Sequence, residues 1–244
     1  MRVTFTIVRR ELGAYFSTPL AYVFLVAFLA AAGAATFYFG DFMERRQADL
    51  TPFFGFHPWL FLVLIPAVGM RLWAEERRNG TVELLMTLPV TPWQAVFGKF
   101  LAAWIFTGLA LALTFPIWIT VNYLGNPDNG VIIASYLASL LMAGALLAVA
   151  STISALTKSQ VVAFVIAVGA SFLLLLSGLD LVLNLFTGWA PDYVIDLVAG
   201  FSFLTHFNAI ASGVLDARAI IFFLSLIVLF LFVNREIVEI KKAA

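Results

Sequence analysis

Residues 75–92 read Glu75-Glu76-Arg77-Arg78-Asn79-Gly80-Thr81-Val82-Glu83-Leu84-Leu85-Met86-Thr87-Leu88-Pro89-Val90-Thr91-Pro92 and interrupt an otherwise apolar chain. Thr81 is a favourable N-cap, Glu83 falls in the first turn, where the helix dipole favours a carboxylate, and Pro89 ends the helix after about two turns. The apolar residues make a stripe too short to cross a membrane: Val82, Leu84, Leu85 and Leu88. We therefore expect this polar segment, residues 75–92, to form a short amphipathic helix at the membrane surface.

A second helix is predicted to begin directly after it. Thr91 is a suitable N-cap, Pro92 suits the first helical position, and Gln94 at the third position completes a capping box. This helix leads past Lys99 into an apolar segment. The polar segment thus joins two membrane spans.

The composition places the chain among integral membrane proteins. Hydrophobic residues make up 63% of the sequence and charged residues 11%, whereas soluble domains are about 45–50% apolar. Cysteine is absent, which excludes disulfides, thiolate metal sites and thiol nucleophiles. Fourteen basic and fourteen acidic residues cancel, and we expect no nucleic-acid partner. The first 16 residues lack the apolar core of a signal peptide, so no cleaved leader is expected.

The predicted fold is all-α, with a single membrane domain over residues 1–244. Residues 1–17 carry Val3, Phe5, Val8, Leu12 and Phe16 at helical spacing among basic residues, which is typical of an amphipathic helix on an anionic lipid surface. Six spans follow, at about 20–39, 58–73, 100–123, 131–156, 161–176 and 218–233. The fourth is rich in small residues, which let helix backbones approach closely in lipid, so we expect it among its neighbours.

Residues 177–217 do not read as one more span. Charged, glycine and proline residues divide this region into apolar pieces that are each too short to cross. Two short helices that dip into the outer surface and return fit the pattern better. The aromatic cluster at 53–59 is expected to lie at the same outer interface.

The distribution of basic residues sets the orientation. With six spans, eleven of the fourteen Lys and Arg residues fall on the face that holds both termini and the polar segment. The positive-inside rule makes that face cytoplasmic. A seven-span topology would place the C-terminal basic residues outside and is disfavoured.

The polar segment resembles the signature of the permease subunits of ABC transporters of the ABC-2 class. That signature combines a glutamate and a basic residue, a Gly-Thr pair, a second glutamate, paired leucines and a proline between the second and third spans. The residues that carry the resemblance are Glu76, Arg77, Gly80, Thr81, Glu83, Leu84, Leu85 and Pro89. Residues 53–59 and 73–76 are also similar to a subgroup that contains the gliding-motility-associated and nitrous-oxide-reductase-maturation permeases.

The resemblance implies a membrane subunit of an ATP-driven exporter in the bacterial inner membrane, with a re-entrant hairpin between spans five and six. In this family the short helix is a coupling helix that docks in a cleft of a separate ATPase subunit. The implied partners are two ATPase copies carrying ATP and Mg, a second and identical permease, and, in the subgroup, a membrane protein with a large outer domain. The docking residues expected here are Glu75, Glu76, Arg77, Gly80, Thr81, Glu83, Leu84, Leu85, Leu88 and Pro89, with exposed charges setting register and leucines entering a groove.

The sequence offers little for catalysis. The Gly98-Lys99 pair lacks the upstream glycine of a P-loop and is followed by Phe100, so ATP binding of that kind is excluded. We expect no enzymatic activity, no metal site and no cofactor in this chain. His57 and His206 lack metal-ligand spacing, and intramembrane proteolysis lacks its serine or paired-aspartate pattern.

Asp180 is the most informative single acid. A carboxylate is costly at mid-membrane, so it either reaches the outer interface or faces a polar cavity together with Ser171 and Ser177. Two alternatives stay open: the polar segment is an ordinary interfacial loop, or the chain is an ATP-independent secondary transporter or channel. The latter would show paired acids or unwound helices in two corresponding halves, and neither these nor an internal repeat is visible in the sequence.

Overall fold

The computed structural model describes residues 2–81, 90–179, 182–184, 191–214 and 216–241. Its helical elements are α1 (Arg2–Phe16), α2 (Pro19–Ala34), the π-helix η1 (Ala35–Phe39), α3 (Thr51–Gly55), α4 (His57–Gly69), α5 (Arg71–Asn79), α7 (Pro92–Ala112), α8 (Phe115–Leu124), α9 (Asn129–Leu156), α10 (Gln160–Leu176), α12 (Asp192–Gly200), α13 (Phe203–Ala211) and α14 (Ala217–Ile240). The prediction of an all-helical membrane fold is confirmed for these residues. The short helix predicted between Thr81 and Pro89 falls on residues 82–89, which lie outside the described residues, as does Asp180.

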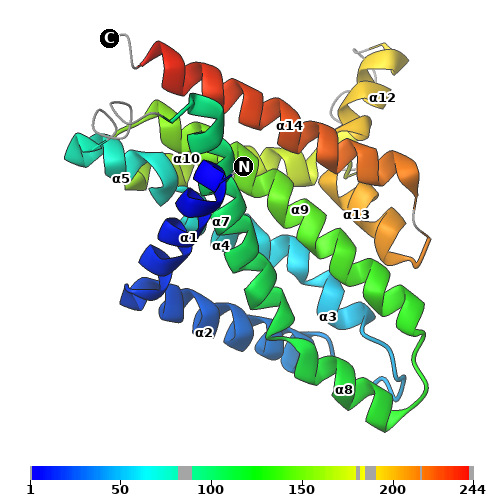
Figure 1. Ribbon diagram of the computed structural model, residues 1–244. Helices are drawn as coiled ribbons and strands as arrows, with labels where there is room; N and C mark the ends of the chain where they lie inside the picture. Colours follow the sequence, from blue (N-terminus) through cyan, green and yellow to red (C-terminus); the bar gives the residue numbers. More distant parts are fainter. Residues whose placement is uncertain (1, 82–89, 180–181, 185–190, 215, 242–244) are drawn as a thin grey trace.

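Helix α9 is the centre of the bundle (Figure 1). It packs against α3, α4, α5, α7, α10, α13 and α14. Small residues make this possible: the Cβ of an alanine at Gly69 would lie 2.5 Å from the Cβ of Ala150, and one at Gly144 would lie 2.8 Å from Nε1 of Trp104. The expectation that this span is surrounded by neighbours is therefore confirmed.

Within the described part of the chain, five helical segments are long and apolar enough to cross a membrane. They run over Ala21–Phe39, His57–Asn79, Pro92–Leu124, Asn129–Leu156 and Ala217–Ile240, and they correspond to predicted spans one, two, three, four and six. The predicted fifth span is the apolar α10, whose 17 residues extend about 26 Å, slightly less than a 30 Å hydrocarbon core. The six-span count stays a prediction.

The region predicted to be re-entrant contains α12 and α13, which are joined with a bend of 59°. The second of these helices packs against α9, α10 and α14. Its Phe203, Phe207 and Ile210 are buried, while Tyr193 and Leu197 of α12 are exposed. A broken pair with one buried and one exposed half is compatible with a re-entrant hairpin and with a broken crossing.

Two spans are interrupted where their sequences contain proline. Helices α4 and α5 meet at Met70, four residues after Pro66. Helices α7 and α8 meet at Thr114, just before Pro116. There the Thr114 hydroxyl donates to the carbonyl of Leu111 and pairs with the hydroxyl of Tyr136. Side-chain hydroxyls thus serve backbone groups at an interruption that lies in an apolar setting.

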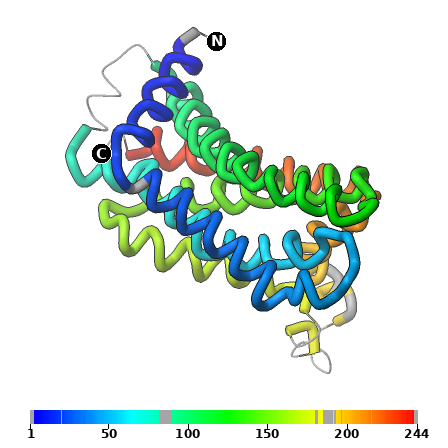
Figure 2. Tube along the Cα trace, turned by 90° about the horizontal axis from the view of Figure 1, so that it is seen from below, coloured from blue at the N-terminus to red at the C-terminus, as the bar shows by residue number. Residues whose placement is uncertain are grey.

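The bundle has two distinct ends (Figures 1 and 2). The N-terminal helix α1, the polar helix α5 and the C-terminus gather at one of them, which we call the α5 end, while α3, α8 and α13 lie towards the opposite end. In α1, Ile7 and Val8 are buried against α7, whereas Phe5 remains 70% exposed. The amphipathic helix therefore divides its apolar residues between the protein and its surroundings.

The aromatic cluster predicted to form an interfacial belt is divided between exposed and buried members, since Trp59 is 45% exposed and Phe56 is half-buried. Phe53, Phe54 and His57 are all buried, and Nδ1 of His57 lies 2.8 Å from the hydroxyl of Ser139. Rings of Phe28, Phe53, Phe54 and Phe61 surround the imidazole. Tertiary packing, which sequence spacing does not reveal, buries these three members of the cluster within the bundle.

Candidate functional site

The α5 end holds the described part of the polar segment, and α5 positions it. Glu75, Glu76 and Arg77 lie on this helix, so they continue the second span rather than belonging to a separate short helix. Gly80 ends α5 in the left-handed conformation, at φ 71°, which glycine adopts without steric cost. Thr81 follows, and its hydroxyl donates to the carbonyl of Glu76 at 3.3 Å. The predicted role of Thr81 as the N-cap of the next helix concerns residues outside the described chain.

The predicted second helix start is confirmed. The hydroxyl of Thr91 accepts from the backbone of Gln94 at 3.3 Å, and the side chain of Gln94 accepts from the backbone of Thr91 at 3.1 Å. With Pro92 in the first turn, α7 has the predicted capping box. Residues 82–89 are therefore held between two defined helix ends, Gly80 and Thr91.

An ion-pair cluster joins α5 to α1 and α7. Lys99 of α7 is only 3% exposed, and its ammonium lies 2.8 Å from Glu76 and 3.3 Å from Glu11. It also lies 5.4 Å from the ring centre of Trp73, within reach of a cation–π contact. Arg10 pairs with Glu11 at 2.6 Å and approaches Glu76 at 3.8 Å. A single buried cation thereby connects three helices that are distant in the sequence.

The cluster shapes the ionisation of nearby groups on α1. Burial would raise the pKa of Glu11, but the positive charges of Lys99 and Arg10 outweigh it and hold that pKa below its ordinary value. Burial raises the pKa of Tyr15, and the negative charge of Glu11 raises it further. Glu11 is thus held as a carboxylate and Tyr15 as a neutral phenol.

Helix α9 holds the other side of α5. Ser154 is fully buried, and its hydroxyl contacts three backbone groups at the junction of α4 and α5. One helical turn further on, the guanidinium of Arg77 donates to the carbonyl of Ala155. Lys241 after α14 donates to the carbonyls of Ala155 and Leu156 at 3.3 and 2.8 Å. Cations at the end of a helix complement both its unpaired carbonyls and its dipole.

Burial lowers the pKa of Lys241, and the nearby positive charge of Arg77 lowers it further. Both cations meet at the carboxyl end of α9, where the helix carbonyls offset their mutual repulsion. The ends of α5, α9 and α14 are therefore joined at one place.

The docking role expected of Glu75, Glu76 and Arg77 stays a prediction, and the structure shows that each of the three also has a partner within the chain. Glu75 pairs with Arg71 at 3.0 Å, Glu76 pairs with Lys99, and Arg77 binds the end of α9. The side chain of Glu75 is 40% exposed and that of Glu76 is 20% exposed, while Arg77 is half-buried. In the described chain, Glu76 and Arg77 hold α5 to the bundle. The sequence analysis did not assign Glu11, Lys99 or Ser154 to the site; the isolated charge of Lys99 between apolar residues was the one available signal.

A cleft of about 720 Å³ opens between α1, α5 and the start of α7. Its lining includes acidic and basic side chains, together with Ser17 and Thr18 between α1 and α2. The residues are Arg10, Glu11, Ala14, Tyr15, Ser17, Thr18, Arg71, Leu72, Glu75, Glu76, Asn79, Thr81 and Lys99. It lies directly beside the point at which residues 82–89 leave α5.

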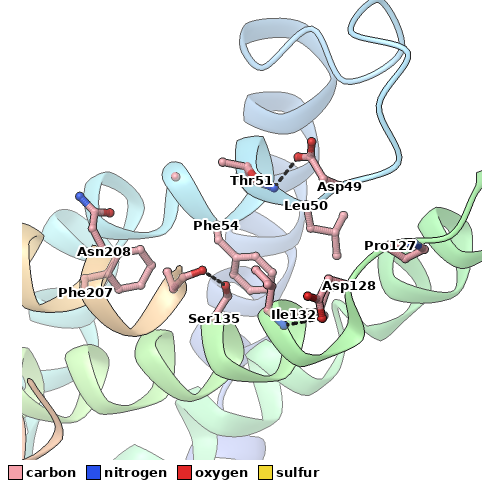
Figure 3. A pocket seen from close by; sticks show the side chains of 13 residues that line it. Asp49, Leu50, Thr51, Phe54, Pro127, Asp128, Ile132, Ser135, Phe207 and Asn208 are labelled. Carbon is pink, nitrogen blue, oxygen red and sulfur yellow. Dashed lines mark hydrogen bonds between the residues drawn. The ribbon is translucent and has the colours of Figure 1, made fainter. Parts of the chain in front are cut away.

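A second cavity, of about 300 Å³, lies at the opposite end of the bundle (Figure 3). It contains two carboxylates, and both serve local backbone groups. Asp49 accepts from the backbone of Thr51 at 2.9 Å, and Asp128 accepts from Gly130 and Val131 as the N-cap of α9. Phe54, Ile132 and Phe207 supply apolar walls. The carboxylates therefore have structural roles that do not require a ligand.

The predicted outer polar path is not assembled among the described residues. Ser171 is buried and its hydroxyl has no hydrogen-bond partner there. The hydroxyl of Ser177 donates to the carbonyl of Leu174 within its own helix at 3.1 Å. Neither lines the two cavities above, and Asp180 lies outside the described residues. Nε2 of His206 donates to the carbonyl of Gly200 at 3.0 Å, and the ring stacks on Phe222.

Two comparisons with known proteins bear on this arrangement. A search among curated proteins found no match. The family model described as ABC-2 family transporter protein matches residues 22–241, which is nearly the whole chain. Proteins of this family are membrane components of transporters and are not themselves catalytic, and the family implies an ABC ATPase partner in general. From the extent of that match and the several apolar helices, this multi-pass membrane protein belongs to the ABC-2 transporter family.

Proposed function

We propose that the chain is the membrane-spanning subunit of an ATP-driven exporter and that the polar segment receives the motion of a separate ATPase subunit. Family membership supports a permease role. The proposal adds the direction of transport, the ATP coupling, and docking through Glu83, Leu84, Leu85 and Leu88. It also adds an orientation with both termini and the α5 end in the cytoplasm of a bacterial inner membrane.

The observation that carries the proposal is the way α5 is fixed to the bundle. Lys99 joins it to α1 and α7, and Ser154 and the end of α9 hold its other side. A force applied to residues 82–89 at the end of such a helix is passed to α7, α9 and α14 rather than absorbed by a loose loop. A rigid link between a docking element and the membrane helices suits a two-state bundle biased by nucleotide.

The proposed assembly contains two ATPase copies and a second copy of this chain. ATP and Mg are bound by the ATPases, and no covalent chemistry takes place in the permease. Substrate would move along a path between the two bundles. In a gliding-related complex, a membrane protein with a large outer domain would join this assembly and force transmission would replace transport.

Affinity purification from native membranes tests the proposal. The tagged chain should retain an ABC ATPase, and Glu83→Arg or Leu84→Asp should abolish that retention. Glu44→Arg is the matched control, because Glu44 is an exposed acid in the loop after η1 and its charge reversal should leave retention unchanged. Retention of the ATPase by both polar-segment variants would contradict docking at this segment, and transport that continues without any ATPase would support the secondary-transporter alternative.

A further inference from the structure

The junction of α4 and α5 carries an unusual backbone arrangement at Ser154. In a continuous helix the N–H of Ala74 would donate to the carbonyl of Met70, four residues earlier. Here the N–H of Ala74 donates to Oγ of Ser154 at 3.0 Å, and that hydroxyl donates to the carbonyl of Met70 at 2.7 Å. The hydroxyl of another helix is thus inserted into the hydrogen-bond ladder, which is a recognised cause of helix bending.

The inserted hydroxyl is fully used. A serine hydroxyl has one proton to donate and two lone pairs to accept with. The N–H of Trp73 donates to the same oxygen at 3.1 Å, so the proton and both lone pairs have partners. Met70 precedes α5 in a helical conformation and supplies no side-chain cap. Ser154 therefore performs from α9 the capping role that the local sequence of α5 lacks.

The surrounding packing fixes the backbone of the α4–α5 junction against α9. Ser154 is fully buried, so a backbone group that lost it as a partner could not turn to water. One turn earlier on the same face of α9, Ala150 contacts the backbone at Gly69, where an added Cβ would lie only 2.5 Å from the Cβ of Ala150. This close approach is what lets a side chain as short as serine reach the junction.

We propose that Ser154 is a positioning residue that sets the direction in which α5 leaves the membrane bundle. The structural role of Ser154 does not depend on the proposed function. Its importance for transport rests on that function, because the direction of α5 would determine where residues 82–89 meet the ATPase. Without the hydroxyl, the N–H of Ala74 and the carbonyl of Met70 can satisfy each other directly, and the helix straightens at Met70. Since α5 has nine residues, it is roughly 13 Å long, and a change of about 20° at Met70 would move its far end by about 5 Å.

Distance measurement between spin labels tests the positioning role in the permease alone. The chain contains no cysteine, so spin labels attach only at the two introduced cysteines and the measured distance is the one between those two positions. Asn79→Cys and Lys158→Cys place one label at the exposed end of α5 and the other in the exposed turn after α9. A reference pair, Lys158→Cys with Glu239→Cys, joins α9 to α14 without crossing the junction.

The expected results separate a positioning role from general destabilisation. Ser154→Ala should shift the 79–158 distance by about 5 Å or broaden its distribution over that range, while the 158–239 distance stays unchanged. Ser154→Thr retains a hydroxyl and should restore the original 79–158 distribution. An unaltered distribution in Ser154→Ala would overturn the inference, as would an equal shift of the reference pair.

A second variant keeps the test decisive if Ser154→Ala fails to fold. Gly69→Ala leaves the hydroxyl in place but forces the junction away from α9, and it should shift the 79–158 distance in the same manner; an unchanged distance would overturn the inference. The ATPase-retention experiment addresses the proposed function separately. If Ser154→Ala shifts the 79–158 distance but the tagged parent chain retains no ATPase, Ser154 is still the positioning residue and the proposed ATPase coupling is wrong. If the parent chain retains the ATPase but Ser154→Ala shifts no distance, the proposed coupling stands and the role of Ser154 is wrong.

Discussion

Replacement of Lys99 by methionine is the sharpest perturbation of the α5 end. The ammonium of Lys99 is the shared partner of Glu76 and Glu11, at 2.8 and 3.3 Å. Methionine keeps most of the side-chain volume but removes the charge. Glu11 and Glu76 then lose their buried cation and keep only Arg10, at 2.6 and 3.8 Å, whose side chain is 51% exposed. The attraction of such a solvent-screened charge is weaker than that of a buried one. We expect Lys99→Met to destabilise the joined helices α1, α5 and α7.

The structure sets the size of the expected loss. Removing one partner of a buried ion pair costs about 3–5 kcal/mol. The side chains of Glu11 and Glu76 retain 15% and 20% exposure, so water screens part of the unpaired charge. We therefore expect the low end, about 3 kcal/mol, which for a chain of this length corresponds to a fall of about 6–12 °C in Tm.

Thermal unfolding in lipid nanodiscs, followed by the fluorescence of the six tryptophans, measures this loss. Lys158→Met is the matched control, because Lys158 is exposed after α9 and its replacement should change Tm by little. Adding Glu76→Gln to Lys99→Met removes one of the two carboxylates that lost Lys99 and should recover part of the loss, as coupled residues do in a double-mutant cycle. If Lys99→Met behaved like Lys158→Met, the ion-pair cluster would not hold the α5 end together.

Three further variants test neighbouring contacts. The pKa of Glu11 is lowered in the folded chain, so the stabilisation by its carboxylate is present above the ordinary pKa of 4.5 and is lost as pH falls through the lowered pKa. Glu11→Gln should therefore have a lower Tm than the parent protein at pH 7. This difference in Tm should shrink below pH 4.5. Thr91→Ala removes the α7 cap and should cost about 1 kcal/mol, measured by the same unfolding assay, and Thr91→Ser should restore it. Arg77→Gln weakens the bond to Ala155 and should cost about 1–2 kcal/mol, with faster hydrogen exchange at the end of α5; unchanged exchange would show that Arg77 does not secure it.

The features that sequence analysis predicted correctly are local ones. The capping box at Thr91 and Gln94 follows from residues three positions apart. The places of five apolar helices follow from runs of apolar residues, although the second helical segment continues to Asn79 and the third begins at Pro92. The close packing of α9 follows from its small side chains, because Gly144 and Ala150 leave room for neighbouring helices whichever these are. Such features require no knowledge of which segments meet in the fold.

The features that it missed depend on long-range contacts. Lys99 meets Glu11 across 88 positions of the sequence, and Ser154 meets Met70 across 84. Nothing in the local pattern of Glu76 distinguishes an internal anchor from an exposed docking charge, since both suit a polar helix end. His57 was placed in an interfacial belt because aromatic residues flank it, and its burial beside Ser139 of α9 depends on a contact across 82 positions. Single-sequence periodicity carries no information about such partners.

Photo-crosslinking from the polar segment tests the central claim most directly. A photoreactive amino acid at Leu84 or Leu85, activated in intact native membranes, should capture an ABC ATPase, and the crosslinked band should be identified by mass spectrometry. The same group at Tyr123, which is 90% exposed at the far end of α8, should not capture it. Crosslinking to the ATPase from both ends or from neither, or capture of an extracytoplasmic protein at Leu84, would contradict the account.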